Sequence, residues 1–316
     1  MKCPASSPFK ILVVLGPTAS GKTRLGVKLA QKFAGEIISA DSRQVYCGMD
    51  IGTGKDLEEY GDIPYHLIDI AMPGDEFNLF KFQRRFLETI AVIQELDHLP
   101  ILVGGTGMYL EAAVKGYRLV EVPQNTILRQ ELADLPLETL AERLRKVSAR
   151  LHNTTDLLER TRLTRAIEIA EYGRFHEPEL LPEPKTLILG IRWDRDTLRQ
   201  RITTRLKERL TQGMIEEVER LNNNGIAWET LESYGLEYRY VALYLKGELR
   251  WNDMFQKLNS SIHAFAKRQE TWFRHMERNG IVIHWLDGAG NTFEEALGII
   301  ENTRFITRAQ VYHVNS

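Results

Sequence analysis

The sequence has few cysteines, almost no excess charge of either sign and no long apolar run. Two cysteines, Cys3 and Cys47, are too few for a disulfide scaffold or a four-cysteine zinc site, and they favour a reducing compartment. A formal charge of −2 excludes a protein that is basic throughout, so any contact with nucleic acid must come from local patches. The apolar run at residues 11–15 is too short for a signal peptide, and no run is long enough to cross a bilayer. We therefore expect a cytoplasmic protein without membrane contact.

Residues 16–23 form the clearest motif of the chain. They match the phosphate-loop pattern G-x-x-x-x-G-K-[ST] at every fixed position, after a predicted buried strand at residues 11–15 and before a predicted helix. The glycines let backbone N–H groups surround an anion at a helix N-terminus. Lys22 adds a charge for terminal phosphates, and the Thr23 hydroxyl can hold Mg²⁺. The residues predicted to bind a phosphorylated ligand are Gly16, Pro17, Thr18, Ala19, Ser20, Gly21, Lys22 and Thr23.

Apolar runs alternate with amphipathic stretches in the first 120 residues and again after residue 185. Further strands are predicted at residues 36–42, 65–70, 100–104, 186–191 and 281–286. Long helices are predicted at residues 79–93, 195–221 and 252–278. This alternation around a phosphate loop favours an α/β fold similar to that of P-loop NTPases, with a mostly parallel sheet and helices on both faces.

Residues 124–172 give no strand signal and have apolar residues at helical spacing instead, as at Leu140, Leu144 and Leu151. Three prolines between residues 178 and 184 then indicate a linker. We therefore predict a small helical insertion at residues 121–185. The α/β core would consist of residues 1–120 and 186–316.

Asp41 ends the second predicted strand, one strand over from the phosphate loop. Ligands of parallel sheets gather at the carboxyl ends of strands, so this carboxylate could be a Mg²⁺ ligand, a general base or a helix cap. Gln44 has the donor and acceptor to read a base edge, unless it is an ordinary loop residue. The turn at residues 104–107 is rich in glycine and indicates a close approach of a helix or a ligand. No Asp ends this strand, which disfavours an ordinary ATPase or kinase.

Basic side chains recur at helical spacing in three places. The three sets are Arg201, Arg205 and Arg209; Lys267, Arg274 and Arg278; and Arg162 and Arg165. A solvated helix face with ion pairs is the usual explanation for each set taken alone. Three sets on a chain of nearly balanced charge also indicate local contacts with phosphates. Trp272 and Phe273 lie beside the second set and could either stack on bases or belong to a core.

Seven segments together resemble the tRNA dimethylallyltransferases, also called isopentenyl-tRNA transferases, of the bacterial type. They are GPTASGKT at 16–23, DSRQVY at 41–46, GMDIGT at 48–53, PYHLID at 64–69, GGTGMYL at 104–110, RLTRAIE at 162–168 and AKRQETWFR at 266–274. The resemblance is dense over residues 10–116, patchy over 121–185 and moderate over 186–287. It is far more specific than the phosphate loop alone.

The resemblance implies transfer of a dimethylallyl group from its diphosphate to N6 of the adenine just 3′ of a tRNA anticodon, with release of diphosphate. The phosphate loop would then bind diphosphate in place of ATP. Asp41 would act as the base at N6, Thr106 would orient the adenine, and Lys22 and Thr23 with Mg²⁺ would neutralise the leaving group. The expected tRNA contacts are Asp41, Ser42, Arg43, Gln44, Thr106, Arg129, Arg162, Arg165, Lys267, Arg268, Gln269, Trp272 and Arg274. The insertion would clasp the anticodon stem-loop, and we expect a monomer.

The chain departs from the family pattern at a residue expected near the diphosphate. Glu237 stands where the family usually has Arg or Lys after Gly-Tyr, so we expect Arg239 to supply that cation. The insertion is shortened, and residues 54–56 read Gly-Lys-Asp where Ala-Lys-Pro is usual. These departures indicate a divergent paralogue. Two alternatives to prenyl transfer remain from the sequence, namely an ATP-dependent small-molecule kinase and a tRNA-binding paralogue with weakened catalysis.

Overall fold

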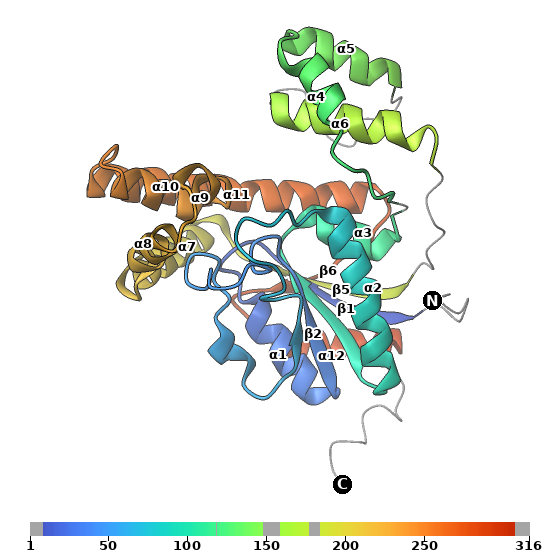
Figure 1. Cartoon of the computed structure of the whole chain (residues 1–316). Helices are drawn as coiled ribbons and strands as arrows, with labels where there is room; N and C mark the ends of the chain where they lie inside the picture. The colour runs from blue at the N-terminus through green and yellow to red at the C-terminus, as the bar shows by residue number, and fades with distance from the viewer. Residues whose placement is uncertain (1–8, 118, 148–158, 177–183, 307–316) are drawn as a thin grey trace. The chain divides into compact units, whose positions relative to one another are not determined.

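The computed structural model describes residues 9–117, 119–147, 159–176 and 184–306. The chain divides into two compact units (Figure 1). One consists of residues 1–116 and 182–316, and the other of residues 117–181. Each unit has its own apolar core. Within the described ranges, no helix is both long and apolar enough to span a membrane.

The larger unit is built on a six-stranded sheet in which every pair of neighbours is parallel. Its strands are β1 (Lys10–Leu15), β2 (Gly35–Ala40), β3 (Tyr65–His66), β4 (Leu99–Gly104), β5 (Lys185–Arg192) and β6 (His284–Asp287). They follow the order β3-β2-β4-β1-β5-β6. The predicted parallel α/β fold is confirmed, although the third strand is only two residues long.

One detail of the predicted strand order is wrong. Asp41 was expected one strand over from the phosphate loop, but β4 lies between β2 and β1. Gly104 is in register with Leu15 of β1 on one side and with Ala40 of β2 on the other. The next residue of each strand, including Asp41, therefore emerges at the same edge of the sheet.

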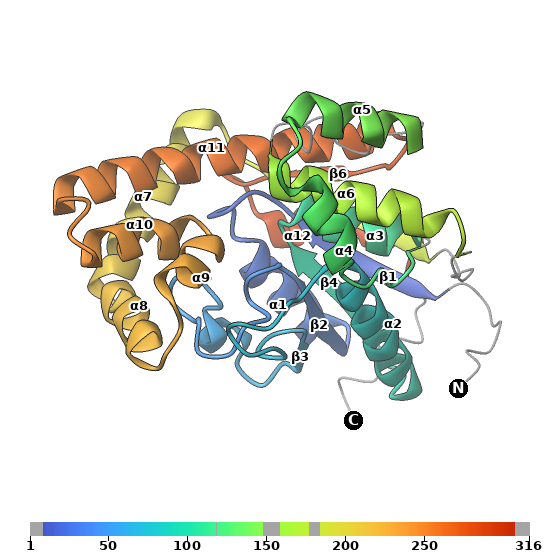
Figure 2. The same ribbon diagram turned by 45° about the horizontal axis from the view of Figure 1, so that its top comes forward.

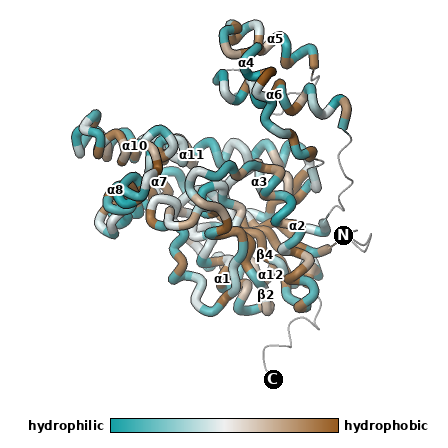
Figure 3. The backbone as a smooth tube through the Cα atoms, viewed as in Figure 1, coloured by the Kyte–Doolittle hydropathy of each residue, from teal (hydrophilic) through white to brown (hydrophobic). Residues whose placement is uncertain are grey.

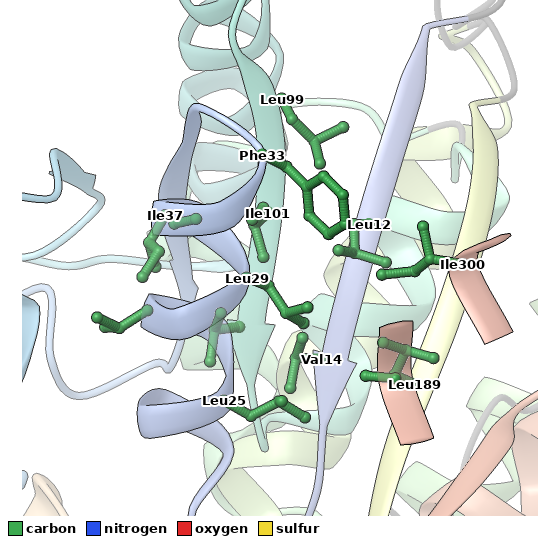
Figure 4. Close-up of a cluster of buried hydrophobic side chains, with 14 of the residues drawn as sticks. Leu12, Val14, Leu25, Leu29, Phe33, Ile37, Leu99, Ile101, Leu189 and Ile300 are labelled. Atoms are coloured by element: carbon green, nitrogen blue, oxygen red, sulfur yellow. The ribbon is translucent and has the colours of Figure 1, made fainter. Parts of the chain in front are cut away.

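Side chains of β1 alternate between two cores because neighbouring residues of a strand point to opposite faces. Leu12 and Val14 join a core covered by α1 (Lys22–Lys32) and α12 (Thr292–Thr303), which Figure 4 shows in close-up. Ile11 and Val13 face the other core, with α2 (Leu79–Glu95), α3 (Gly107–Lys115) and α11 (Trp251–Arg278) (Figure 2). The sheet is thus covered on both faces, and the brown strands at the centre of Figure 3 reflect their apolar sequences.

The region predicted as one helix over residues 195–221 is two helices, α7 (Arg195–Thr211) and α8 (Met214–Asn223). Gly213 separates them with a φ of 103°, a left-handed conformation that glycine adopts without steric penalty. Two helices that we did not predict follow, α9 (Trp228–Ser233) and α10 (Leu236–Leu245), as does α12 near the end of the chain. Together with α11, helices α7 to α10 form a third apolar core, and a short 3₁₀ helix lies at η1 (Leu57–Tyr60).

The smaller unit contains α4 (Thr126–Ala133), α5 (Leu137–Val147) and α6 (Arg160–Gly173). Leu140 and Leu144, which were predicted on the basis of their spacing, are buried in its core. Leu151 and the first two linker prolines, Pro178 and Pro182, lie outside the described residues.

Glu168 is a buried carboxylate that joins three parts of this smaller unit. Its oxygens accept hydrogen bonds from Arg129 Nε at 2.7 Å, from Arg165 Nη1 at 2.9 Å and from the backbone N–H of Asn125 at 3.0 Å. Arg165 also donates to the carbonyl of Val122 at 2.7 Å. Burial opposes ionisation of Glu168, but these hydrogen bonds outweigh burial and lower its pKa to about 2.

We predict that Glu168→Gln destabilises the smaller unit by about 2 kcal/mol, because charge-assisted hydrogen bonds to a buried carboxylate are lost. Hydrogen exchange of α4 and α6 in the full chain measures the effect. The matched control is Glu171→Gln, since Glu171 also pairs with an arginine at 2.7 Å but is half-exposed. Glu171→Gln should destabilise the smaller unit by less than about 1 kcal/mol. Equal hydrogen-exchange protection of α4 and α6 in Glu168→Gln and Glu171→Gln would contradict the stabilising role of Glu168.

The same network should make the smaller unit sensitive to acid. The pKa of Glu168 is lower in the folded protein than the ordinary value of 4.5, so its ionisation stabilises the fold fully above that pH. The stabilisation should decline as the pH falls towards 2. In Glu168→Gln, protection of α4 and α6 should fall less over this range.

Candidate active site

The phosphate loop closes between β1 and α1 with the strand–loop–helix geometry that its motif requires. Gly21 has a φ of 90° and precedes α1, and the Ser20 N–H donates to the Pro17 carbonyl at 3.2 Å. Two loop carbonyls are held by side chains from outside the loop. The Arg201 Nε donates to Ala19 at 2.8 Å, and the Trp193 Nε1 donates to Ser20 at 3.0 Å.

Gln269 fixes the loop from the other side. Its Oε1 accepts from the Thr18 N–H at 2.8 Å, and its Nε2 donates to the Gly105 carbonyl at 2.9 Å. The residue is only 6% exposed. Gln269 was predicted to contact tRNA, but both ends of its amide are engaged in tying α11 to the loops after β1 and β4. Its position is that of a structural support.

Asp41 and Thr106 meet beside the phosphate loop. The Asp41 Oδ1 accepts from the Arg43 N–H at 2.9 Å, and the Thr106 Oγ1 accepts from the Ser42 N–H at 3.2 Å. The Thr106 N–H donates to the Ala40 carbonyl at 3.3 Å. Both side chains are half-buried, and the Asp41 charge acts on Lys22. The structure thus brings together three of the residues that the sequence selected.

Gln44 makes a hydrogen bond at each end of its side-chain amide. Its Oε1 accepts from the Ser39 hydroxyl at 2.8 Å, and its Nε2 donates to the Gly54 carbonyl at 3.0 Å. Each end of the amide keeps one further hydrogen-bonding position, so the reading of a base edge by Gln44 stays a prediction.

Lys22 is surrounded by charges of both signs. Burial and the Arg205 guanidinium lower the pKa of Lys22 to about 8, and Arg209 adds to this effect, whereas Asp41 opposes it. Lys22 also donates to the Pro17 carbonyl at 3.4 Å. A polyanion bound at the loop would favour the charged form of Lys22 and raise its pKa again.

Arg201, Arg205 and Arg209 of α7 do not form a solvated face. Arg201 contacts the phosphate loop and stacks on Trp193, with its guanidinium carbon 4.2 Å from the ring centroid. Arg205 pairs with Asp56, and Arg209 is buried near Glu237. Their spacing of four residues singled out these arginines in the sequence. The explanation favoured there was a solvated helix face with ion pairs within the helix, and the structure differs from it.

Glu217 is a supporting residue that we did not predict. Its carboxylate accepts hydrogen bonds from the backbone N–H groups of Asp50, Ile51 and Gly52 at 2.8–2.9 Å and from the Tyr238 hydroxyl at 2.7 Å. It thereby holds the GMDIGT segment against α8 and α10. One feature of the sequence could have identified Glu217. It is a carboxylate on the apolar side of α8, between the buried residues Met214 and Val218.

The predicted tRNA contacts divide into exposed and engaged residues. Lys267, Arg268 and Arg274 are exposed on α11. Trp272 is half-buried, and its Nε1 donates to Glu111 at 3.1 Å. In the smaller unit, Arg129 and Arg165 bind Glu168, as described above. Arg162 is exposed and pairs with Glu159 at 2.9 Å.

A magnesium site would have to rely mainly on the ligand's own oxygens. Within the described residues there is no group of three or more His, Cys, Asp or Glu side chains that could hold a metal ion. Thr23 is half-buried at the start of α1. One hydroxyl with phosphate oxygens and waters is a usual Mg²⁺ environment, so the residues present fit this ion.

A parallel sheet with this loop at the end of β1 defines an α/β protein of the P-loop class. A family model described as IPP transferase matches residues 44–276, and a model described as isopentenyl transferase matches residues 9–60. The chain belongs to the IPP transferase family. These matches confirm the family and the prenyltransferase class that the sequence motifs predicted.

Curated relatives agree with this family. The chain is 65% identical to "tRNA dimethylallyltransferase 1" of Geotalea daltonii, over 94% of this chain and 96% of that protein. It is 62% identical to "tRNA dimethylallyltransferase 2" of Citrifermentans bemidjiense, over 93% of this chain and 96% of that protein.

Solved structures share the fold. The full-length tRNA isopentenylpyrophosphate transferase of Bacillus halodurans superposes with a TM-score of 0.69 at 30% identity, covering 96% of this chain and 97% of that one. A eukaryotic dimethylallyltransferase acting on tRNA superposes with a TM-score of 0.76, covering 94% of this chain and 79% of that one. At 24% identity, the second likeness concerns the fold alone.

We predict that Gln269→Leu lowers the free energy of unfolding by about 2–4 kcal/mol, because the Thr18 N–H and the Gly105 carbonyl lose their partner. Urea unfolding of the full chain measures the loss. Arg268→Gln, at the exposed neighbouring position, should change the value by less than about 0.5 kcal/mol. If the two variants were equally stable, Gln269 would not be the link between α11 and the phosphate loop.

Proposed function

We propose that this protein transfers a dimethylallyl group from dimethylallyl diphosphate to N6 of an adenine in tRNA, at the position 3′ of the anticodon. The observation that carries the proposal is the meeting of the phosphate loop, Asp41 and Thr106 at one edge of the sheet. Membership of the family and the names of close relatives support the same reaction. The glycine turn after β4, where ATPases keep a metal-binding Asp, adds support against the kinase alternative.

In the proposed reaction, N6 attacks C1 of the dimethylallyl group while the bond from C1 to the diphosphate oxygen breaks. The aromatic amine is a weak nucleophile, so loss of its proton to the Asp41 carboxylate promotes attack. The Thr106 oxygen accepts from Ser42, which leaves its hydroxyl hydrogen able to donate to a ring nitrogen of the adenine. The products are the N6-substituted adenine, diphosphate and a proton held by Asp41.

Negative charge develops on the diphosphate as its bond to C1 breaks. Lys22 and the backbone N–H groups at the N-terminus of α1 would stabilise that charge. Mg²⁺, held by Thr23 and the diphosphate oxygens, would neutralise part of the same charge.

The test of this function uses labelled dimethylallyl diphosphate and unmodified tRNA. Nuclease digestion of the product should yield N6-prenyladenosine in amounts that depend on both substrates. ATP turnover that does not require dimethylallyl diphosphate would favour the kinase instead. Tight tRNA binding without product would indicate the tRNA-binding paralogue.

We predict that Asp41→Asn lowers kcat for tRNA prenylation about 10²–10⁴-fold, the usual contribution of a general base. Asn keeps the acceptor for Arg43, so the loop should stay in place. Binding of inorganic pyrophosphate, measured by calorimetry, should be unchanged or tighter because a negative charge near Lys22 is removed. Asp62→Asn, in an exposed loop, is the control. If Asp41→Asn lost pyrophosphate binding and catalysis to the same extent, Asp41 would not be the general base.

We propose that Lys267, Arg268 and Arg274 contact tRNA phosphates. Changing all three to Gln should raise the KM for tRNA and reduce the slope of log affinity against log salt by about 2–3, since each phosphate contact contributes about 0.7–0.9. The KM for dimethylallyl diphosphate should not change. Lys28→Gln with Lys32→Gln, on α1 at the opposite face of the sheet, is the control. If the slope of log affinity against log salt were the same in the triple variant as in the wild type, these three residues would not contact tRNA phosphates.

A further inference from the structure

The glycine turn after β4 is held by one face of α11. Gln269 and Trp272 are three residues apart on that helix, so their side chains lie on the same face. Gln269 Nε2 donates to the Gly105 carbonyl at 2.9 Å. Trp272 packs on Gly107, where an added Cβ would be 2.3 Å from Cδ1 and Cγ of the indole. Thr106 therefore lies between two contacts with α11.

The indole of Trp272 is itself held by a buried carboxylate. Its Nε1 donates to Glu111 Oε2 at 3.1 Å, and Glu111 is only 2% exposed. Glu111 comes four residues after Gly107 on α3, so the two residues lie on the same side of that helix. Lys115 Nζ lies 3.7 Å from Glu111 Oε1 and balances the charge, as a buried carboxylate requires.

Thr106 is attached to the first turn of α3. Its carbonyl accepts from the N–H groups of Tyr109 at 3.0 Å and Leu110 at 3.1 Å. Its hydroxyl oxygen accepts from the Ser42 N–H at 3.2 Å, in the loop that begins with Asp41. A shift of the first turn of α3 would therefore move the Thr106 hydroxyl relative to Asp41.

We propose that Trp272 and Glu111 are positioning residues for Thr106. The indole fixes the first turn of α3 through its contact with Gly107, and Glu111 fixes the indole through its N–H group. This inference rests on the proposed function, in which the Thr106 hydroxyl donates to the adenine. A displaced orienting group lowers the rate of a reaction, because the reacting atoms are aligned less often.

The contacts of Trp272 favour this role over stacking on a tRNA base. A stacking side chain must present an open ring face to the base. Gly107 covers part of the indole, and Glu111 accepts its N–H. The exposed cations of α11 are those proposed above to contact tRNA, namely Lys267, Arg268 and Arg274. One helix would thus present cations to tRNA and hold the turn that orients the adenine.

The test is a double-mutant cycle that joins Trp272 and Thr106. Trp272→Phe removes the N–H that bonds Glu111 and should lower kcat for tRNA prenylation about 3–10-fold. Thr106→Ala removes the hydroxyl and should lower kcat by at least as much. In the Thr106→Ala background, Trp272→Phe should change kcat by less than about twofold, because the group that it positions is absent. The KM for dimethylallyl diphosphate should not change.

The matched control is Trp251→Phe, the same substitution at the start of α11, where the residue is 44% exposed. Its kcat should stay within about twofold of the wild type. Glu111→Gln keeps an acceptor for the indole N–H and should lose less kcat than Glu111→Leu, which should resemble Trp272→Phe. Circular dichroism verifies that each variant is folded.

Two kinetic outcomes would overturn the inference. If Trp272→Phe lowered kcat as much in the Thr106→Ala background as in the wild type, or if Thr106→Ala left kcat unchanged, Trp272 would not act through Thr106. A higher KM for tRNA with an unchanged kcat in Trp272→Phe would show that the indole contacts tRNA instead.

Hydrogen exchange at Ser42, measured by NMR on the full chain, gives a readout that does not need activity. The Ser42 N–H bonds Thr106 Oγ1, so Trp272→Phe and Thr106→Ala should each speed its exchange about 3–10-fold. Trp251→Phe should not. If Trp272→Phe instead sped exchange equally throughout β1 and β4, its role would be one of general stability.

The outcomes also separate this inference from the proposed function. If the wild type prenylates tRNA, but Trp272→Phe has the kcat and the Ser42 exchange rate of the wild type, the inference is wrong and the function stands. If the wild type forms no prenylated tRNA, but Ser42 exchange responds to Trp272→Phe and not to Trp251→Phe, the function is wrong and the positioning of Thr106 stands.

Discussion

The parallel register of three strands determines where this protein can do chemistry. Gly104 at the end of β4 is opposite both Leu15 of β1 and Ala40 of β2, so the three strands end at the same level. The next residues are those of the phosphate loop, the glycine turn and Asp41. An added Cβ at Gly104 would clash with the backbone and side chain of Ala40, so glycine is needed for this close pairing. A slip of one residue would separate the carboxylate from the loop.

Helices that cover the sheet also fix the loops at its edge. Gln269 of α11 ties the phosphate loop to the turn after β4, and Glu217 of α8 holds the segment around Asp50. Both side chains are buried and bond to backbone groups, which places the loops without occupying the site. A rigid surround of this kind positions reacting groups before the substrate binds.

Charge is distributed differently in the two units. Around the phosphate loop, burial and then the charge of Arg205 lower the pKa of both Lys22 and Arg209. In the smaller unit, Arg129 and Arg165 are satisfied internally by Glu168 and stabilise the helices. Arginines that look alike in sequence therefore have different partners: Arg129 and Arg165 share a buried carboxylate, whereas Arg201 contacts the phosphate loop.

The phosphate loop, the parallel α/β fold and the family could all be predicted from the amino-acid sequence, because they depend on contiguous patterns such as residues 16–23. The sequence also selected Asp41 and Thr106, which follow strands. The folded structure was needed to show that β4 lies between β1 and β2, that Gly213 separates two helices, and that Gln269 and Glu217 hold backbone groups of distant loops. It also placed Arg201 against the phosphate loop. A hydrogen bond or ion pair depends on which surfaces pack together, and residues such as Thr18 and Gln269, 251 positions apart, leave no local pattern of their contact.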